Sequence, residues 1–222
     1  MANPEQNQDG QDKAALPHGV YTRVDFLRHG LPDGHGCLRG HTDFVITETG
    51  MMQMEQAVLG LDDIETVISS PLQRCSHFAQ SFAEKCRQPL SLNPQWMEMN
   101  FGDWDGQSHQ SLWDKHGSTL AKYWENPWLG NPHGGESLEA FDTRIAKAWQ
   151  CLLSEQLGKR LLVVTHAGVM KQLLRLLLEL PQNANYLHRI ELPYAARYRV
   201  TVFTDQQGQH WPQIQWPIQQ QF

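Results

Sequence analysis

Residues 161–168, which read LLVVTHAG, decide the fold of this chain. The four apolar residues at 161–164 form a continuous run, which is typical of a strand covered on both faces, as in a parallel sheet between helices. The run stops before His166, and a leucine-rich helical pattern begins directly after Gly168. A buried strand that passes into a helix through a short turn predicts an α/β fold.

Two more strand ends repeat this pattern earlier in the chain. Residues 20–26 alternate with a period of two, and this segment ends at the triplet 28–30, RHG. A short strand at 65–68 runs into the segment 69–74, SSPLQR, which begins a helical pattern. Strands that alternate with helices predict a three-layer α/β/α fold with a mostly parallel central sheet and a small, partly helical cap insertion.

Cap residues mark where the expected helices begin. Ser70 is expected as an N-cap, with Pro71 at the first helical position and Gln73 completing a capping box. Thr47 is expected to cap an earlier helix that carries apolar residues up to Val58. Apolar periodicity predicts further helices over 72–86 and 138–152, and a final strand over 199–204.

Composition excludes several classes of protein. The 222 residues are 40% apolar, which is enough chain for one large domain with a sizeable core. The 18 lysines and arginines and 24 aspartates and glutamates give a net charge of −6, so no nucleic-acid or acidic membrane partner is expected. Four scattered cysteines predict no disulfide scaffold. Without a signal-like apolar segment or a run of about 18 apolar residues, we expect a cytoplasmic protein.

The chain divides into one domain flanked by two tails. The first residues are polar and lack periodicity, and two prolines interrupt the last stretch, which is either an extended strand or arm or a partly ordered tail. The expected boundaries are a mobile tail at 1–17, a domain at 18–205 with a cap insertion at about 106–136, and a C-terminal arm or tail at 206–222. The sequence does not indicate an oligomeric state.

The three strand ends bring four chemically useful side chains together. Ligands of such sheets bind beyond the carboxyl ends of the strands, where His29, His166, Arg28 and Arg74 would converge. Guanidinium groups and helix N-termini match phosphate oxygens, so this crevice is an expected anion site. Arg74 lies in a first helical turn, which disfavours a cation unless an anion is bound there. A histidine in such a site is an anion ligand, a proton donor or a nucleophile.

Four motifs occur in a fixed order along the chain: FLRHG at 26–30, SSPLQR at 69–74, Glu98 before FGDW at 101–104, and THAG at 165–168. Together they resemble the histidine phosphatase superfamily, in its phosphoglycerate-mutase-like branch. The similarity spans about residues 20 to 180, and the stretch 40–43, GHTD, with Thr47 and Gly50, resembles a further family segment.

The resemblance implies a role for each matched residue. His29 corresponds to the nucleophile that carries the phosphoryl group, and Glu98 to the general acid and then base. Arg28, Arg74, His166 and the backbone N–H of Ala167 correspond to the phosphate pocket, with no metal and no cofactor. Ala167 stands where another branch has an acidic aspartate, so Glu98 is the preferred acid over Asp103 and Asp105.

The chemistry of phosphoryl transfer makes sense of these roles. The transferring group spreads negative charge over three oxygens, so fixed positive donors are the main catalytic device. A neutral ring nitrogen of His29 must face phosphorus, so its other ring nitrogen is expected to donate to a backbone carbonyl.

Leu31-Pro32-Asp33 depart from the family pattern, in which a glutamate or serine, a threonine and an asparagine are common. The hydroxyl or amide that often assists substrate phosphate is therefore missing from its usual place. This departure keeps open an alternative from another class, a catalytically weak module that binds a phosphorylated ligand. A histidine-rich metal protein is disfavoured, because the 11 histidines form no HxH or HxxxH pair with plausible second ligands.

The expected cap carries four aromatic residues, namely Trp113, Tyr123, Trp124 and Trp128. These side chains either pack into the core or offer aromatic faces to a ligand. The acidic charge balance and the short cap favour hydrolysis over the mutase reaction. A closer resemblance, carried by MEMNFGDWD at 97–105 and GGESL at 134–138 with Phe141 and Arg144, is to α-ribazole phosphatases of cobalamin synthesis.

That resemblance implies a small-molecule phosphate monoester as the partner, with a 5′-phosphate removed from a benzimidazole riboside. A broad-specificity sugar-phosphate or phosphoglycerate phosphatase or mutase stays open as the alternative substrate class.

Overall fold

A computed structural model of the protein describes residues 19–216. The predicted tail at 1–17 and the last part of the predicted arm, 217–222, lie outside the described residues. No helix in the part of the chain that the structure describes is long and apolar enough to cross a membrane.

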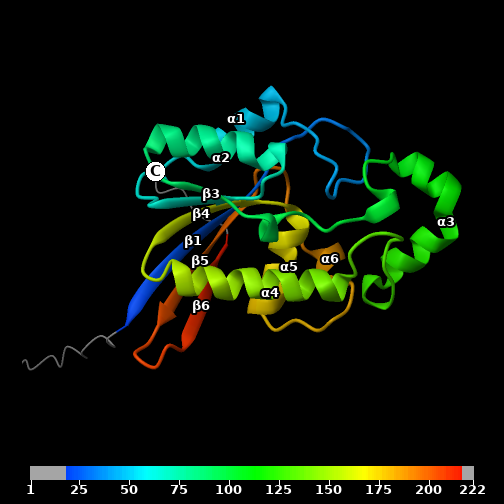
Figure 1. The fold of residues 1–222 in the computed structure, drawn as a ribbon. Coiled ribbons are helices and arrows are strands. Elements are labelled where there is room, and N and C mark those ends of the chain that lie inside the picture. Colours follow the sequence, from blue (N-terminus) through cyan, green and yellow to red (C-terminus); the bar gives the residue numbers. More distant parts are fainter. Residues whose placement is uncertain (1–18, 217–222) are drawn as a thin grey trace, which may run out of the picture.

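A six-stranded mixed sheet forms the centre of the molecule (Figure 1). Its four parallel strands confirm the predicted α/β sheet, and two antiparallel strands extend it at one edge. In spatial order the strands are β3 (Leu90–Leu92), β2 (Thr66–Ser69), β4 (Arg160–Thr165), β1 (Val20–Arg28), β5 (Arg197–Thr204) and β6 (His210–Gln215).

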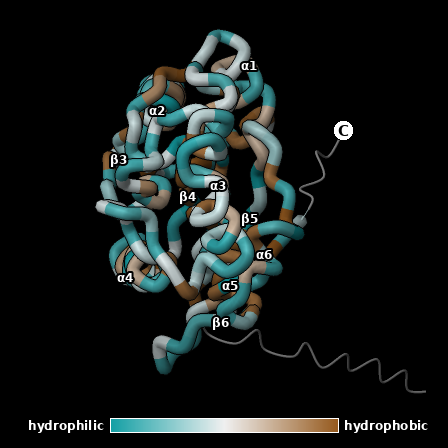
Figure 2. Tube along the Cα trace, turned by 90° about the vertical axis from the view of Figure 1, so that its right-hand side faces the viewer, coloured by the Kyte–Doolittle hydropathy of each residue, from teal (hydrophilic) through white to brown (hydrophobic). Residues whose placement is uncertain are grey.

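Helices cover both faces of this sheet, as the continuous apolar run of β4 predicts (Figures 1 and 2). All of residues 161–165 are buried. One layer contains α1 (Glu48–Ala57) and α2 (Gln73–Cys86), which pack with Leu27, Leu162 and Val164. The other contains α4 (Leu138–Glu155), α5 (Ala167–Leu177) and α6 (Asn185–Arg189), which pack with Phe26, Val163 and Val200.

The segment after Glu98 stands beyond the end of the sheet (Figure 1). It contains the 3₁₀ turn η2 (Gly102–Trp104), the helix α3 (His109–Glu125), and the turn η3 (Pro127–Leu129), while η1 (Pro94–Trp96) precedes it. Figure 2, viewed from that end, shows α3 in front of the strands between the two helical layers. This part of the chain therefore lies at the end of the sheet where β1 and β4 finish.

The predicted capping box before α2 is wrong. The helix begins at Gln73, and its N-cap, Leu72, makes no side-chain capping bond. Instead Asp43 from a distant loop accepts hydrogen bonds from the Gln73 backbone N–H (2.7 Å) and from its side-chain amide (3.1 Å). Ser70 Oγ instead lies 2.8 Å from His166 Nε2 and accepts only a long hydrogen bond of 3.4 Å, from the Leu72 N–H. Thr47, in contrast, caps α1 as expected, because its Oγ1 accepts from the Gly50 N–H.

Candidate active site

The carboxyl ends of β1 and β4 bring the two histidines together. The strands pair in parallel with Arg28 opposite Thr165, so His29 and His166 follow at the same level. The His29 N–H donates to the Thr165 carbonyl at 2.9 Å, and the two imidazole rings meet edge to face with centroids 5.3 Å apart. Arg74 joins them from the first turn of α2, where its Nε donates to His166 Nδ1 at 3.3 Å.

His29 is held in one neutral form. Its Nδ1 lies 2.8 Å from the Gly30 carbonyl, which can only accept, so Nδ1 carries the proton and Nε2 keeps its lone pair. Burial, followed by the charges of Arg74 and Arg28, holds the pKa of His29 well below its usual value of 6.5. The next residue must be glycine, since a Cβ on Gly30 would lie 2.0 Å from the Gly50 carbonyl oxygen.

His166 is neutral as well, in the opposite tautomer. Its Nδ1 accepts from Arg74, so Nε2 carries the proton and donates to Ser70 Oγ at 2.8 Å. Burial and the neighbouring Arg74 hold its pKa well below 6.5. Cys75 packs beside the ring, and burial raises the pKa of its thiol to about 12, so it stays protonated and donates to the Thr165 carbonyl.

Arg74 is fully buried, and a loop supplies its remaining partners. Its Nη1 donates to the Thr42 carbonyl at 3.0 Å, and its Nη2 donates to the Gly40 carbonyl. The loop is held in turn by Asp105, whose carboxylate accepts from the backbone N–H groups of residues 40–42. Burial acts to raise the pKa of Asp105, but these hydrogen bonds together outweigh it and lower the pKa. Asp105 is thus a support of the Arg74 site.

Arg28 offers the site a buried donor without a protein partner. Its guanidinium lies over the Tyr194 ring, 4.3 Å from the centroid, and donates through Nη1 to the Leu192 carbonyl. Within residues 19–216, its buried Nε has no hydrogen-bond acceptor. Burial, which is the largest influence, lowers the pKa of Arg28. A desolvated cation with a free N–H favours a bound anion beside it.

Glu98 reaches the N-terminus of α5. Its Oε2 accepts from the Gly168 N–H at 3.0 Å, and its Oε1 accepts from the N–H of the following residue, Met99, at 3.1 Å. A Cβ on Gly168 would lie 2.2 Å from Glu98 Oε1, so only glycine leaves room for the carboxylate. Ala167 begins the same helix, where a backbone N–H has no carbonyl in a preceding turn.

A cavity of about 290 Å³ opens beside this cluster. Four of the six predicted site residues line it, namely Arg28, His29, Glu98 and Ala167. Arg74 and His166 are fully buried and are not among its lining residues; they lie behind His29. The structure therefore brings all six residues together, with four at the cavity and two in the layer beneath.

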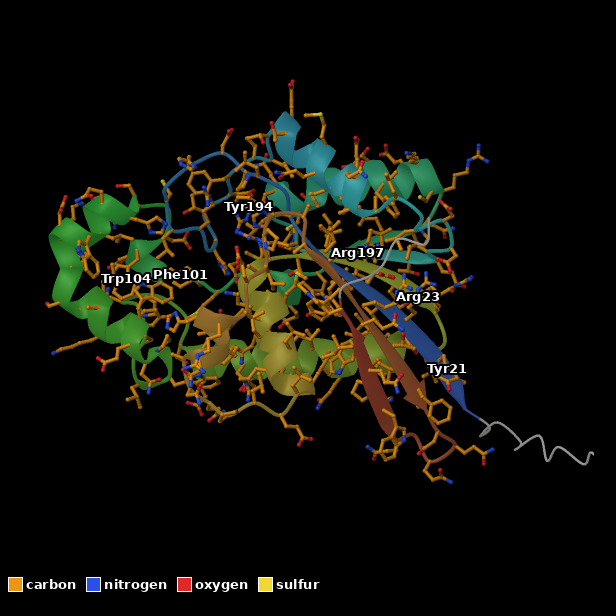
Figure 3. The ribbon with its side chains drawn as sticks, turned by 180° about the vertical axis from the view of Figure 1, so that it is seen from behind. Tyr21, Arg23, Phe101, Trp104, Tyr194 and Arg197 are labelled. Carbon is orange, nitrogen blue, oxygen red and sulfur yellow. The ribbon has the colours of Figure 1, made fainter. Side chains whose placement is uncertain are left out.

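The outer wall of the cavity is aromatic and partly cationic. Its aromatic members are Phe101, Tyr123, Trp124 and Phe141, so two of the four cap aromatics reach the cavity. Trp113 instead has 55% of its surface exposed and is not a lining residue. Figure 3 shows Phe101 and Trp104 beside α3 at the end of the sheet that also carries Tyr194, opposite the end that carries Tyr21.

Sequence reasoning missed two cations of this wall, Lys171 and Arg39. Lys171 donates to the Leu187 carbonyl at 2.6 Å, and burial, with the charge of Arg28, lowers its pKa. The sequence could have predicted this position for Lys171, because Lys171 follows Ala167 by four residues and so lies on the same face of the helix. Arg39 lies in an irregular loop and had no such signal.

The departure at Leu31-Pro32 lies outside the cavity lining. The Leu31 carbonyl accepts from both the N–H and the hydroxyl of Thr47, and Pro32 forms a bridge with Ile46. This loop is thereby tied to the start of α1. Among the residues from 19 to 216, no group of three histidine, cysteine, aspartate or glutamate side chains could hold a metal ion.

This fold and site define an α/β protein with two buried histidines and two arginines at the carboxyl ends of its parallel strands. The chain belongs to the histidine phosphatase superfamily (branch 1), whose family model matches residues 24–212. This confirms the family resemblance, and phosphatase relatives support the same class of enzyme.

Three known proteins are similar to this chain. The adenosylcobalamin/alpha-ribazole phosphatase of Escherichia coli (strain K12) is 28% identical over 174 residues, which are 76% of this chain and 85% of that protein. A mycobacterial glucosyl-3-phosphoglycerate phosphatase solved with VO3 is 26% identical, with a TM-score of 0.73 over 86% of this chain and 96% of its own. The α-ribazole phosphatase of Shigella flexneri, at 24% identity and a TM-score of 0.71 over 87% and 94% of the two chains, shares the fold.

Proposed function

We propose that this protein hydrolyses small phosphate monoesters through a phosphohistidine at His29, without a metal ion. The observation that carries the proposal is the fixed tautomer of His29, whose Nδ1 is bonded to the Gly30 carbonyl and whose ring lines the cavity. The nitrogen left over, Nε2, has the lone pair that a nucleophile requires. The low pKa of His29 keeps that lone pair available at neutral pH and below.

In the first step, His29 Nε2 forms a bond to phosphorus as the ester P–O bond breaks. The Glu98 carboxyl group gives its proton to the departing oxygen, so the alcohol leaves neutral. In the second step, the Glu98 carboxylate takes a proton from water, and the oxygen of that water forms a bond to phosphorus as the P–N bond breaks. Phosphate leaves, and His29 and Glu98 return to their starting states.

Four groups would stabilise the charge on the transferring phosphoryl group. Arg28 and Ala167 line the cavity, where the Arg28 guanidinium and the Ala167 N–H at the start of α5 would donate to phosphate oxygens. Arg74 and His166 would act from beneath the cavity lining. The positive charge of Arg74 would stabilise the transferring group, and the Nε2–H of His166 would reach a phosphate oxygen by exchanging Ser70 for it.

For the substrate, we propose α-ribazole 5′-phosphate. The aromatic wall formed by Phe101, Tyr123, Trp124 and Phe141 suits the flat face of a benzimidazole, and a relative at 28% identity is an adenosylcobalamin/alpha-ribazole phosphatase. A second candidate is a phosphorylated sugar acid, because Lys171 and Arg39 add cations to the same wall and a relative acts on glucosyl-3-phosphoglycerate.

A phosphatase screen in EDTA tests both the reaction and its substrate. We expect phosphate release from α-ribazole 5′-phosphate to exceed that from phosphoglycerates, sugar phosphates and nucleotides, and His29→Ala to lower kcat/KM by at least about 10³-fold. A preference for a sugar acid phosphate would favour the second candidate. Need for a metal would contradict the mechanism, and turnover equal to that of His29→Ala on every ester would indicate a binding module.

A further inference from the structure

We propose that Arg144, together with its partner Glu136, is the positioning residue for Glu98. Arg144 lies on α4 and does not line the cavity, yet its guanidinium fixes the chain segment that carries the Glu98 side chain. The inference rests on the proposed role of Glu98 as general acid, and the experiment below separates a failure of one from a failure of the other.

The guanidinium of Arg144 donates hydrogen bonds to three backbone carbonyls of this segment. It donates to the carbonyls of Gln95 at 2.7 Å, Met97 at 2.9 Å and Glu98 at 3.2 Å. The carbonyl between them, on Trp96, accepts from the Thr165 hydroxyl at 2.7 Å. Every carbonyl from 95 to 98 therefore has a donor that comes from another part of the chain. The last two residues of η1 and the two residues that follow it are thus fixed by side chains from other parts of the chain.

Glu136 completes the arrangement. Its carboxylate accepts from Arg144 Nε at 2.9 Å and from Nη2 at 2.8 Å, in the two-pronged geometry of a strong ion pair. Both side chains have less than a fifth of their surface exposed, at 17% and 16%. Glu136 also ties down the chain beyond Glu98, because its N–H donates to the Asn100 carbonyl at 2.8 Å.

These contacts use the whole donor set of an arginine. Nε donates once, to Glu136; Nη1 donates twice, to Gln95 and Met97; and Nη2 donates twice, to Glu98 and Glu136. A guanidinium has five N–H donors in one plane, whereas the ammonium of lysine has three on a single atom. Lysine at 144 would keep the positive charge but could not bond all three carbonyls and the carboxylate.

The catalytic cycle explains why Glu98 needs a support that does not depend on its charge. The N–H groups of Gly168 and Met99 donate hydrogen bonds to the carboxylate oxygens of Glu98. The acid must be protonated before it can donate to the leaving oxygen, and those two bonds are weaker in that state. The bonds from Arg144 act on the backbone of Glu98, so they hold the side chain in place in either protonation state.

Leaving groups of different acidity provide the test. An acidic alcohol such as p-nitrophenol departs without a proton, whereas an alkyl alcohol needs the general acid. We expect Arg144→Lys to lower kcat/KM for ethyl phosphate at least about tenfold, within the range that general acid catalysis supplies, and to change that for p-nitrophenyl phosphate less than threefold. The constant kcat/KM is chosen because it reports the steps up to departure of the alcohol.

Arg175→Lys is the matched control. Arg175 is also a mostly buried guanidinium, paired with Asp142 and bonded to the Leu180 carbonyl, but it does not contact the segment around Glu98. We expect this variant to change kcat/KM for the two esters by the same factor. Glu136→Gln, which keeps the shape of the partner, repeats the test if Arg144→Lys does not fold. An equal loss on both esters, or no loss on ethyl phosphate, would overturn the inference.

Glu98→Gln separates the inference from the proposed function. If Glu98→Gln lowers kcat/KM for ethyl phosphate but not for p-nitrophenyl phosphate, the role of Glu98 as the acid is supported. The Arg144 variants then test the positioning role alone. In the double variant, which carries Glu98→Gln and Arg144→Lys, kcat/KM for ethyl phosphate should then be no lower than in Glu98→Gln alone. Both changes impair the same proton transfer to the leaving oxygen. If Glu98→Gln affects both esters equally, the proposed acid is wrong and the inference falls with it.

Discussion

At the scale of single residues, the site depends on two histidines that are buried without charge. His29 and His166 have 4% and 0% of their surfaces exposed, and each has one ring nitrogen fixed as a donor and the other kept free of a proton. They differ in which nitrogen is protonated, because a carbonyl faces Nδ1 of His29 and a guanidinium faces Nδ1 of His166. The neighbouring groups thus hold two identical rings in opposite tautomers, as the proposed roles of nucleophile and donor require.

These histidines make the stability of the fold depend on pH. Both have folded-state pKa values well below 6.5, while the unfolded chain has ordinary ones. Above pH 6.5 neither state binds the protons; as the pH falls below 6.5 only the unfolded state takes them up, so stability falls. We expect each histidine to cost about 1.4 kcal/mol of stability between pH 7.5 and pH 5.5, as measured by urea unfolding.

Glutamine variants check the source of this slope. His29→Gln and His166→Gln should each remove about one proton from the pH dependence of the unfolding free energy. His133→Gln is the control at a histidine outside the buried pair, with its side chain 90% exposed. If His29→Gln and His166→Gln show the same pH dependence of the unfolding free energy as His133→Gln, the burial of neutral histidines is contradicted.

At the scale of elements, connections between segments far apart in the chain hold the site. The loop at 40–42 presents its carbonyls to Arg74, and Asp105, just after η2, holds that loop through its backbone N–H groups. The helix α3 beyond it turns Tyr123 and Trp124 toward the cavity. The two histidines thus follow the ends of strands, whereas the loop at 40–42 supports Arg74 and the cap lines the cavity.

Asp105→Ala should release the loop that supports Arg74. We expect the unfolding free energy to fall by about 3 kcal/mol, because three backbone N–H groups lose a charged acceptor, and the Kd for inorganic phosphate to rise. Asp103→Ala is the control two residues away, since the Asp103 side chain is 69% exposed and pairs only with His133 among the salt bridges found within 19–216. Equal effects of the two variants on phosphate binding would contradict the role of Asp105.

Trp124→Ala tests whether the cap contacts the leaving group. We expect KM for α-ribazole 5′-phosphate to rise about tenfold, since an aromatic contact contributes about 1 kcal/mol beyond the apolar area it buries, while kcat/KM for ethyl phosphate changes less than twofold. Trp113→Ala, on the same helix but away from the cavity, should change neither. An equal rise in KM for both esters would show that Trp124 acts only through the fold.

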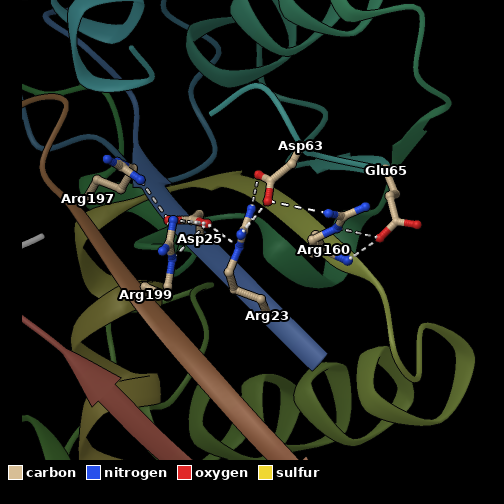
Figure 4. Close-up of polar contacts among 7 residues, drawn as sticks. All are labelled: Arg23, Asp25, Asp63, Glu65, Arg160, Arg197 and Arg199. Carbon is tan, nitrogen blue, oxygen red and sulfur yellow. Dashed lines mark hydrogen bonds and ion pairs between the residues drawn. The ribbon is translucent and has the colours of Figure 1, made fainter. Parts of the chain in front are cut away.

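At the scale of the whole molecule, one buried carboxylate joins the parallel and antiparallel parts of the sheet. Asp25 on β1 is fully buried and pairs with Arg197 at 2.7 Å and Arg199 at 3.1 Å, both on the antiparallel strand β5 (Figure 4). Arg23 approaches Asp25 from the same strand and also pairs with Asp63, outside the sheet. The boundary between the two strand directions therefore has an ion-pair network as well as backbone bonds.

Asp25→Asn should destabilise the molecule strongly. Removing one partner of a buried pair leaves the other charge uncompensated, so we expect a loss of about 3 to 5 kcal/mol in urea unfolding. Asp63→Asn is the control at the rim of the same network, with its side chain 41% exposed, and should cost less than about 1 kcal/mol. A loss below 1 kcal/mol for Asp25→Asn would contradict the importance of the network.

The sequence by itself determined the parts of this protein that depend on local patterns. The apolar run at 161–164 required a strand covered on both faces, and three strand ends predicted where His29, Arg74 and His166 would meet. These features can be predicted from the sequence because periodicity and capping depend on residues that are only a few positions apart. Short elements escaped these patterns, since β3 has three residues and α6 has five. The strand β6, which contains Pro212, confirms one of the two alternatives expected for the last stretch.

Only the tertiary structure decided what each reactive group faces. Arg74 and His166 are 92 residues apart in the chain, and Glu98 and Gly168 are 70 apart, so no local pattern reports these contacts. The same limit explains why the capping box predicted for α2 is wrong. Asp43 accepts from the Gln73 N–H, and Ser70 Oγ contacts His166 Nε2. A side chain bonds the best partner that the fold brings within about 3 Å, and that choice exists only once the chain has folded.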